Sequence, residues 1–115
     1  MRQWLVNPKC LCKKHLLGEH VECHMMLGSL KKKKSLTRFL NEGLYDVSKL
    51  EVRHNELVSE MQLRGYNHKS LLDFKPEYLS YLTNTGSVNI EQNINELKRR
   101  CPECSVRIET IYNRG

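Results

Sequence analysis

The stretch from His15 to His24 gathers side chains that can do acid–base chemistry on one expected helix. At about 100° per residue, a wide arc of this helix is mostly apolar, formed by Cys12, Leu16, Cys23, Met26, Leu27 and Leu30. Glu22 falls inside this arc, close to His15 and Glu19. A carboxylate turned toward the interior needs a partner or a function, because an unpaired buried charge is costly. Glu22 is therefore a structural ion-pair member, a half-exposed side chain, or a catalytic acid–base group.

A second reactive group belongs to the start of the chain. An α-amine has an ordinary pKa of about 7.7–8, against about 10.4 for lysine, so roughly a tenth of it is neutral at pH 7. A neutral amine on Met1, held beside a buried carboxylate, would act as a Schiff-base nucleophile with an adjacent general acid/base.

The cysteines raise the question of a metal site. Cys101-Pro-Glu-Cys104 has zinc-ribbon or redox spacing, and Cys10 and Cys12 are the candidates for a second ligand pair. Cys10 and Cys12, however, diverge by about 200° on the expected helix. We therefore expect buried or incidental thiols, with no metal and no cofactor.

Two histidines share one face of the same helix. His20 and His24 stand at i and i+4, the spacing of two ligands for one metal. The glutamate of a His-Glu-x-x-His motif does not accompany them. The pair is expected to face solvent or phosphate.

The net charge of +6 is concentrated at the beginning of the chain. Residues 1–40 carry nine Lys/Arg against two acids, which gives +7, and the remainder carries ten against eleven, which gives −1. This asymmetry favours a polyanionic partner such as nucleic acid, with a solubilising surface as the alternative. The lysines able to follow a phosphate backbone are Lys13, Lys14, Lys31, Lys32, Lys33 and Lys34.

The hydrophobic pattern predicts an all-α (mainly α) chain that forms a single domain over residues 1–115. Residues 1–6 are expected to dock onto the domain, and 106–111 form the one stretch with strand-like alternation. Helices are expected over residues 8–28, 36–41, 50–64 and 90–101, with a helical turn at 77–82. The expected caps are Ser35 and Ser48 for the second and third helices and Asn89 for the last, which Pro102 ends. The polar face of the third helix is expected to carry Arg53–Glu56 and Glu60. No apolar run nears 18 residues and no signal peptide is evident, so a cytoplasmic protein without a membrane segment is expected.

Five segments together resemble a known family in their order and spacing. They are Met1-Arg2, His15-Leu-Leu-Gly-Glu-His-Val-Glu22 with Gly28, Arg53-His-Asn-Glu-Leu-Val-Ser-Glu-Met61, Arg64-Gly-Tyr66, and Leu97-Lys-Arg-Arg-Cys-Pro-Glu-Cys104. The chain resembles the pyrimidine-dimer DNA glycosylases, the phage-type endonuclease V family, over nearly its whole length. The resemblance implies a compact helical domain whose N-terminal segment threads between helices. It also implies a monomer that acts without metal or cofactor on double-stranded DNA containing pyrimidine dimers or abasic sites, in a bacterial cell or a phage-infected host.

By position, the family's catalytic groups fall on Met1 and Glu22, and its DNA-contacting groups on Arg2, His15 and Glu19. Because Met1 precedes a bulky residue, its own amine is the expected nucleophile. The chain departs from the best-known members at Val21 and Met25, where those carry arginines that touch DNA. The alternatives are a DNA-binding accessory protein of the same fold, a glycosylase for another damaged or modified base, and a zinc-dependent interaction module.

Overall fold

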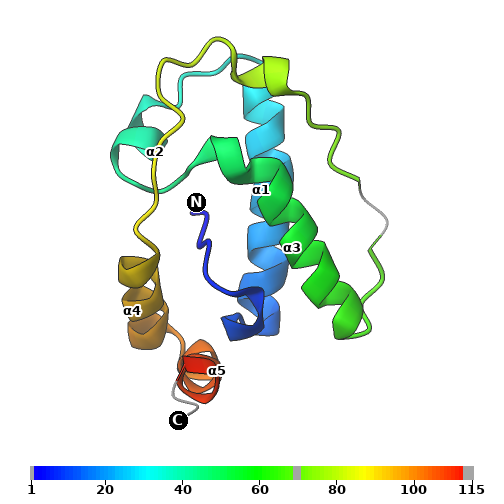
Figure 1. Ribbon diagram of the computed structural model, residues 1–115, viewed down its shortest axis with the longest axis vertical. Helices are drawn as coiled ribbons and strands as arrows, with labels where there is room; N and C mark the ends of the chain where they lie inside the picture. Colours follow the sequence, from blue (N-terminus) through cyan, green and yellow to red (C-terminus); the bar gives the residue numbers. More distant parts are fainter. Residues whose placement is uncertain (1, 69–70, 113–115) are drawn as a thin grey trace.

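The longest helix, α1 (Lys13–Lys31), runs through the middle of the molecule and packs against α3 (Leu50–Leu63) in the computed structural model (Figure 1). The structure describes residues 2–68 and 71–112. Within them, the remaining helices are α2 (Thr37–Asn41), α4 (Ile90–Arg100) and α5 (Pro102–Tyr112), with 3₁₀ turns at Pro8–Cys10, Val47–Lys49 and Pro76–Leu79 and no strand. The expected all-α fold is confirmed, and so is the helical turn expected near residues 77–82.

The apolar arc expected on the first helix is buried. All six of its members belong to the hydrophobic core, namely Cys12, Leu16, Cys23, Met26, Leu27 and Leu30. The expected bounds of that helix were wrong at both ends. Asn7 caps only a 3₁₀ turn, and the chain then breaks at Cys12, whose backbone is extended and whose Sγ accepts the N–H of His15. At the other end the helix continues past Gly28, because the next turn buries Leu30.

The expected serine caps are replaced by other residues. Leu36 precedes α2 without a side-chain cap, and the hydroxyl of Ser35 instead meets that of Thr37 at 3.3 Å. Before α3, Asp46 accepts the N–H of Ser48 and caps the 3₁₀ turn that leads into the helix. Asn89 does cap α4 by accepting the N–H of Gln92 at 3.0 Å.

The prediction for the polar face of α3 is wrong for three of its five residues. Arg53, His54 and Glu60 are 1%, 2% and 8% exposed, whereas Asn55 and Glu56 face solvent as expected. The buried polar side chains have partners: Glu60 accepts from Arg64 at 2.8 Å, and Arg64 also donates to the carbonyl of Leu11 at 2.8 Å. Arg64 therefore holds the end of α3 against the turn that precedes α1.

The end of the chain differs most from expectation. Pro102 ends α4 but also begins α5, because Cys101 has the extended backbone that suits a residue before proline and proline fits the first helical position. The strand-like stretch at residues 106–111 is therefore helical. Ile108 is buried on the same face of α5 as Cys104, four residues earlier, whereas Val106 is exposed.

The N-terminal segment docks as expected, over the residues the structure describes. Gln3 donates its N–H to the carbonyl of Leu44 at 2.9 Å and accepts the N–H of Asp46 at 2.8 Å. From the other side, the Asn93 amide on α4 donates to the carbonyl of Trp4 at 2.8 Å. The segment thus lies between α4 and the loop before α3 (Figure 1).

Residues 2–68 and 71–112 contain no helix with both the length and the apolar character needed to span a membrane.

Candidate active site

A cleft of about 450 Å³ opens beside the first half of α1. It collects side chains from the N-terminal segment, α1, the loop after α2 and the end of α4, and its lining residues are Arg2, Trp4, Lys14, His15, Gly18, Glu19, Glu22, Leu44 and Arg100. Five residues assigned to the site from sequence therefore share one cleft, namely Arg2, Lys14, His15, Glu19 and Glu22. Met1, the expected nucleophile, lies outside the described residues.

Glu22 presents a half-buried carboxylate to this cleft. The hydroxyl of Tyr45 donates to Glu22 Oε2 at 2.8 Å. Burial raises the pKa of Tyr45 well above its usual range, and the hydrogen bond to Glu22 raises it further, so the phenol remains a proton donor. This donor orients the carboxylate of Glu22 in the lining of the cleft.

Glu19 has a different environment one turn earlier. Its carboxylate accepts from Arg53 Nε at 2.6 Å and Nη2 at 2.8 Å, and both side chains are almost completely buried. The third bond of Arg53 reaches the carbonyl of Val6 at 2.6 Å. This geometry gives Glu19 a structural role, fixing α1, α3 and the N-terminal segment together, rather than a surface for contacting DNA.

Arg2 stands at the mouth of the cleft, with its guanidinium 4.8 Å from the centre of the Trp4 ring. It also donates a long hydrogen bond of 3.4 Å to Asn93. Lys14 and Arg100 complete a positive rim around Glu22. Charge of this sign attracts phosphate groups.

The four-lysine run ends α1 and continues into an exposed loop, as expected from sequence. Lys31 lies 4.0 Å from Asp73 in an exposed ion pair, while Lys13 stands over the Tyr66 ring at 5.4 Å. At about 1.5 Å per residue, Lys14 and Lys31 are about 26 Å apart along the helix. The two basic groups therefore lie at the two ends of α1, and Lys14 is part of the cleft lining.

The histidines differ from expectation. His15 turns Nδ1 toward two sulfurs, 3.1 Å from Cys12 Sγ and 3.4 Å from Cys104 Sγ. His20, expected to face solvent or phosphate, is only 9% exposed and contacts His68 Nε2 at 2.9 Å. His24 is half-buried and meets His54 Nε2 at 3.3 Å.

Three residues that organise the cleft were not assigned from sequence. Tyr45 and Asn93 carry no local signal, since a lone tyrosine in a loop and an asparagine on a polar helix are common. Arg53 belongs to one of the family-like segments, but helical spacing placed it on a solvent face. Its buried partner, Glu19, was the available clue, because two opposite charges on packed faces of neighbouring helices can pair.

The arrangement is suited to acid–base chemistry next to a polyanion. A carboxylate held by a neutral donor can stabilise a cationic centre and move protons, and the positive rim can hold phosphates on either side. The family model for pyrimidine dimer DNA glycosylase matches residues 1–74 of this chain. No curated protein and no solved structure matches the chain significantly.

Proposed function

The chain belongs to the pyrimidine dimer DNA glycosylase family, and from this premise we propose that it excises cyclobutane pyrimidine dimers and then cleaves the strand at the resulting abasic site. One observation carries the proposal. The carboxylate of Glu22, oriented by Tyr45, lies in the same cleft as Arg2, and the α-amine is one residue before Arg2 in the chain.

The first step is base removal. The neutral α-amine of Met1 attacks C1′ of the damaged nucleotide as the glycosylic bond breaks and the bonding electrons leave with the base. The negative charge of Glu22 stabilises the cationic character that develops on the sugar. Glu22 carries one proton from the attached amine to the ring oxygen O4′ as the C1′–O4′ bond breaks. Opening of the sugar ring then leaves C1′ joined to the amine as a protonated imine.

The second step is strand cleavage. The imine makes the C2′ proton acidic, and Glu22 accepts that proton. The electron pair forms the C2′–C3′ double bond and expels the 3′ phosphate. Water then hydrolyses the imine and releases the amine. Access to C1′ costs less at a dimer than at normal sequence, because the damaged bases are poorly stacked.

The test of this proposal is reductive trapping. The full chain is incubated with a dimer-containing duplex, and separately with an abasic duplex, in the presence of borohydride. A covalent adduct mapped to the Met1 amine is expected with both duplexes, and one extra residue before Met1 should suppress it. Lys14→Ala is the matched control, because Lys14 is the amine-bearing side chain in the cleft lining.

Each other outcome has a distinct meaning. An adduct that maps to Lys14 would contradict the assignment of the nucleophile. Trapping with the abasic duplex alone would make the protein a glycosylase for another base or a lyase. Val21 and Met25 are then the first residues to examine, because both are about half exposed next to Glu22 on α1. Tight DNA binding without any adduct would identify a non-enzymatic accessory protein.

A second prediction concerns affinity. The span of about 26 Å between the basic ends of α1 equals seven to eight base pairs at about 3.4 Å each. Replacement of all four lysines of Lys31–Lys34 by alanine should weaken binding to damaged and undamaged duplexes alike. It should also reduce the salt dependence by up to about 0.9 per lost phosphate contact.

The control for this loss of charge is Lys49→Ala/Lys98→Ala. Those lysines are paired with Asp46 and Glu109 and offer less positive charge to a phosphate. Affinity titrations at several salt concentrations measure both variants. If the four-lysine variant behaves like the control, the run is only a solvated surface.

A further inference from the structure

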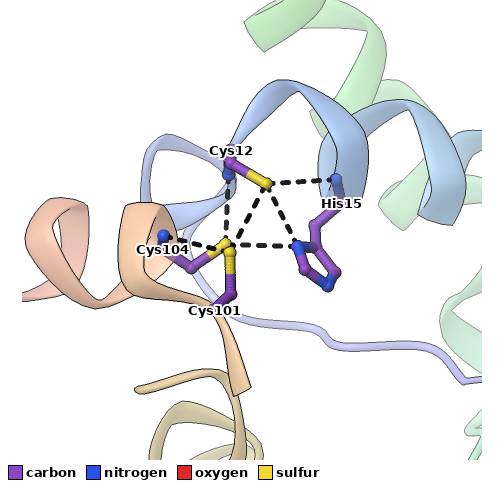
Figure 2. Close-up of side chains that lie close together, drawn as sticks. All are labelled: Cys12, His15, Cys101 and Cys104. Carbon is purple, nitrogen blue, oxygen red and sulfur yellow. Dashed lines mark hydrogen bonds between the residues drawn. The ribbon is translucent and has the colours of Figure 1, made fainter. Parts of the chain in front are cut away.

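The structure gathers four metal-binding side chains where α1 and α5 begin. Figure 2 shows the thiols of Cys12, Cys101 and Cys104 and the ring of His15 turned toward one another. Each residue offers one donor atom, and all four donors lie within 4.8 Å of one another. We call these residues the Cys–His cluster.

The separations fit one shared tetrahedral ion. With zinc–sulfur bonds near 2.3 Å and zinc–nitrogen bonds near 2.0 Å, two sulfurs lie about 3.8 Å apart, and a sulfur and a nitrogen about 3.5 Å apart. The Sγ atoms of Cys12 and Cys101 are 3.8 Å apart. His15 Nδ1 lies 3.1 Å and 3.4 Å from the sulfurs of Cys12 and Cys104. The cysteines are free, and one disulfide would account for only two of the four converging groups.

The local backbone also favours thiolates at this point. Cys12 and His15 are the cap and third residue of α1, and Cys101 and Cys104 occupy the same two positions of α5. In each helix a backbone N–H donates to the capping sulfur at 3.4 Å, from His15 and from Cys104. Helix N-termini stabilise negative charge on a capping sulfur.

We propose that the Cys–His cluster binds one structural zinc ion. Binding releases the protons of three thiols and leaves a site with a net charge of −1. Lys14 and Arg100, which exert their positive charge on His15, offset that charge. This differs from the sequence-based expectation of no metal, which weighed Cys10 and Cys12 together as the second ligand pair and set them aside because they diverge on a helix. In the structure Cys10 is buried outside the cluster, and His15 provides the fourth donor.

The zinc would have a defined mechanical effect. It would fix the junction of α4 and α5 against the start of α1, in addition to the core contacts that Cys12 and Cys104 already make there. Asn93, which donates to the carbonyl of Trp4, and Arg100, which lines the cleft, both belong to α4. A zinc ion that fixes α4 would therefore also hold the N-terminal segment and one wall of the cleft. Two of the four ligands lie beyond residues 1–74, so the site extends past the part of the chain that the family model matches.

Metal content and cobalt spectroscopy test this proposal without any activity measurement. Full-length protein loaded with Co²⁺ should show the intense visible bands of tetrahedral cobalt and a sulfur-to-cobalt charge-transfer band. Cys101→Ser/Cys104→Ser should lose that charge-transfer band and one equivalent of zinc. The matched control Cys10→Ala removes a buried thiol outside the cluster and should keep both.

A gain-of-ligand variant guards against misfolding as an explanation. His15→Cys should retain the metal and strengthen the charge-transfer band, because a fourth thiolate replaces the imidazole. A full-length protein that takes up no zinc or cobalt under reducing conditions would overturn the proposal. So would a charge-transfer band that survives in Cys101→Ser/Cys104→Ser, or a Cys101–Cys104 disulfide that forms in the presence of zinc.

A second and independent group consists of His20, His24, His54 and His68, which we call the histidine cluster. It joins two positions on α1, one on α3 and one in the loop after α3. Its donor atoms also lie within 4.8 Å of one another, and two of the Nε2–Nε2 separations are 2.9 Å and 3.3 Å. Around a tetrahedral zinc, two nitrogens are about 3.3 Å apart.

The side chains of this cluster are suited to metal binding because each imidazole offers one ring nitrogen to the same small volume. Imidazole nitrogen is a common ligand of zinc and of other divalent transition metals.

We infer that the histidine cluster binds a divalent ion of the zinc type, which would hold α1, α3 and the following loop together.

In the Cys101→Ser/Cys104→Ser background, one equivalent of zinc should remain, and cobalt bound in its place should show no thiolate charge-transfer band. Adding His24→Ala/His68→Ala to this background should abolish binding of the remaining zinc. The inference is wrong if that background already binds no metal, or if the added changes lower the melting temperature while the zinc stays. His24→Ala/His68→Ala alone should keep the charge-transfer band, which separates the two sites.

Discussion

Replacement of Glu22 by glutamine is expected to lower glycosylase turnover by about 10²–10⁴-fold, while DNA affinity stays close to that of the unchanged protein. Glutamine keeps the shape of the side chain, and its carbonyl oxygen can still accept the hydrogen bond that Tyr45 donates at 2.8 Å. What disappears is the negative charge beside the cationic sugar and the group that accepts the C2′ proton. Single-turnover kinetics on a dimer-containing duplex measure the effect.

Cleavage of a preformed abasic site should fall less in the same variant, because imine formation depends mainly on the α-amine. Tyr45→Phe separates the charge from its orientation. The phenylalanine leaves the Glu22 carboxylate in place and removes its hydrogen-bond donor. The loss of turnover should be smaller than in Glu22→Gln, because a hydrogen bond to a charged group contributes about 1.5–3 kcal/mol. A stable Glu22→Gln variant with full activity would show that Glu22 is not catalytic.

Replacement of Arg53 by methionine is expected to cost about 3–5 kcal/mol of unfolding free energy. The guanidinium makes two bonds to Glu19 and one to the carbonyl of Val6, all at 2.6–2.8 Å and nearly without solvent. Methionine would leave the buried carboxylate without a partner. Denaturant unfolding of the purified variant measures the loss.

The surface offers a matched comparison. Lys98 and Glu109 form an ion pair of 2.7 Å with both side chains well exposed. Lys98→Met should change stability by no more than about 1 kcal/mol, because water solvates and screens that pair. Arg53→Met/Glu19→Met should recover part of the loss, since neither charge is then left alone. Equal losses in Arg53→Met and Lys98→Met would contradict the structural role assigned to the buried pair.

The sequence predicted the helical class and the buried face of α1 because both depend on local pattern. The apolar arc of α1 identified its buried face, and Glu22 stood out as a charge inside that arc. Asn89 was a correct cap because its side-chain oxygen can accept a free N–H of the first helical turn. These features require only residues within a few turns of one another.

The features that were missed depend on distant residues. Arg53 and His54 are polar, so helical spacing alone assigns them to solvent, and only Glu19 and His24 on α1 reverse that assignment. Pro102 stops one helix and starts another, because a proline that cannot continue α4 can occupy the first turn of α5. The Cys–His cluster joins residues about ninety positions apart, and nothing in the sequence marked His15 as a partner of Cys104.

The position of Trp4 makes the cleft accessible to optical measurement. It is the only tryptophan in the chain, it is 7% exposed, and it lies under the guanidinium of Arg2 and edge-on to the ring of His15. Its fluorescence therefore reports on a small volume that DNA, a bound zinc ion or release of the N-terminal segment would each perturb. Circular dichroism follows the helices of the whole molecule instead. The two signals together can separate local opening of the N-terminal segment from global unfolding, without any added label.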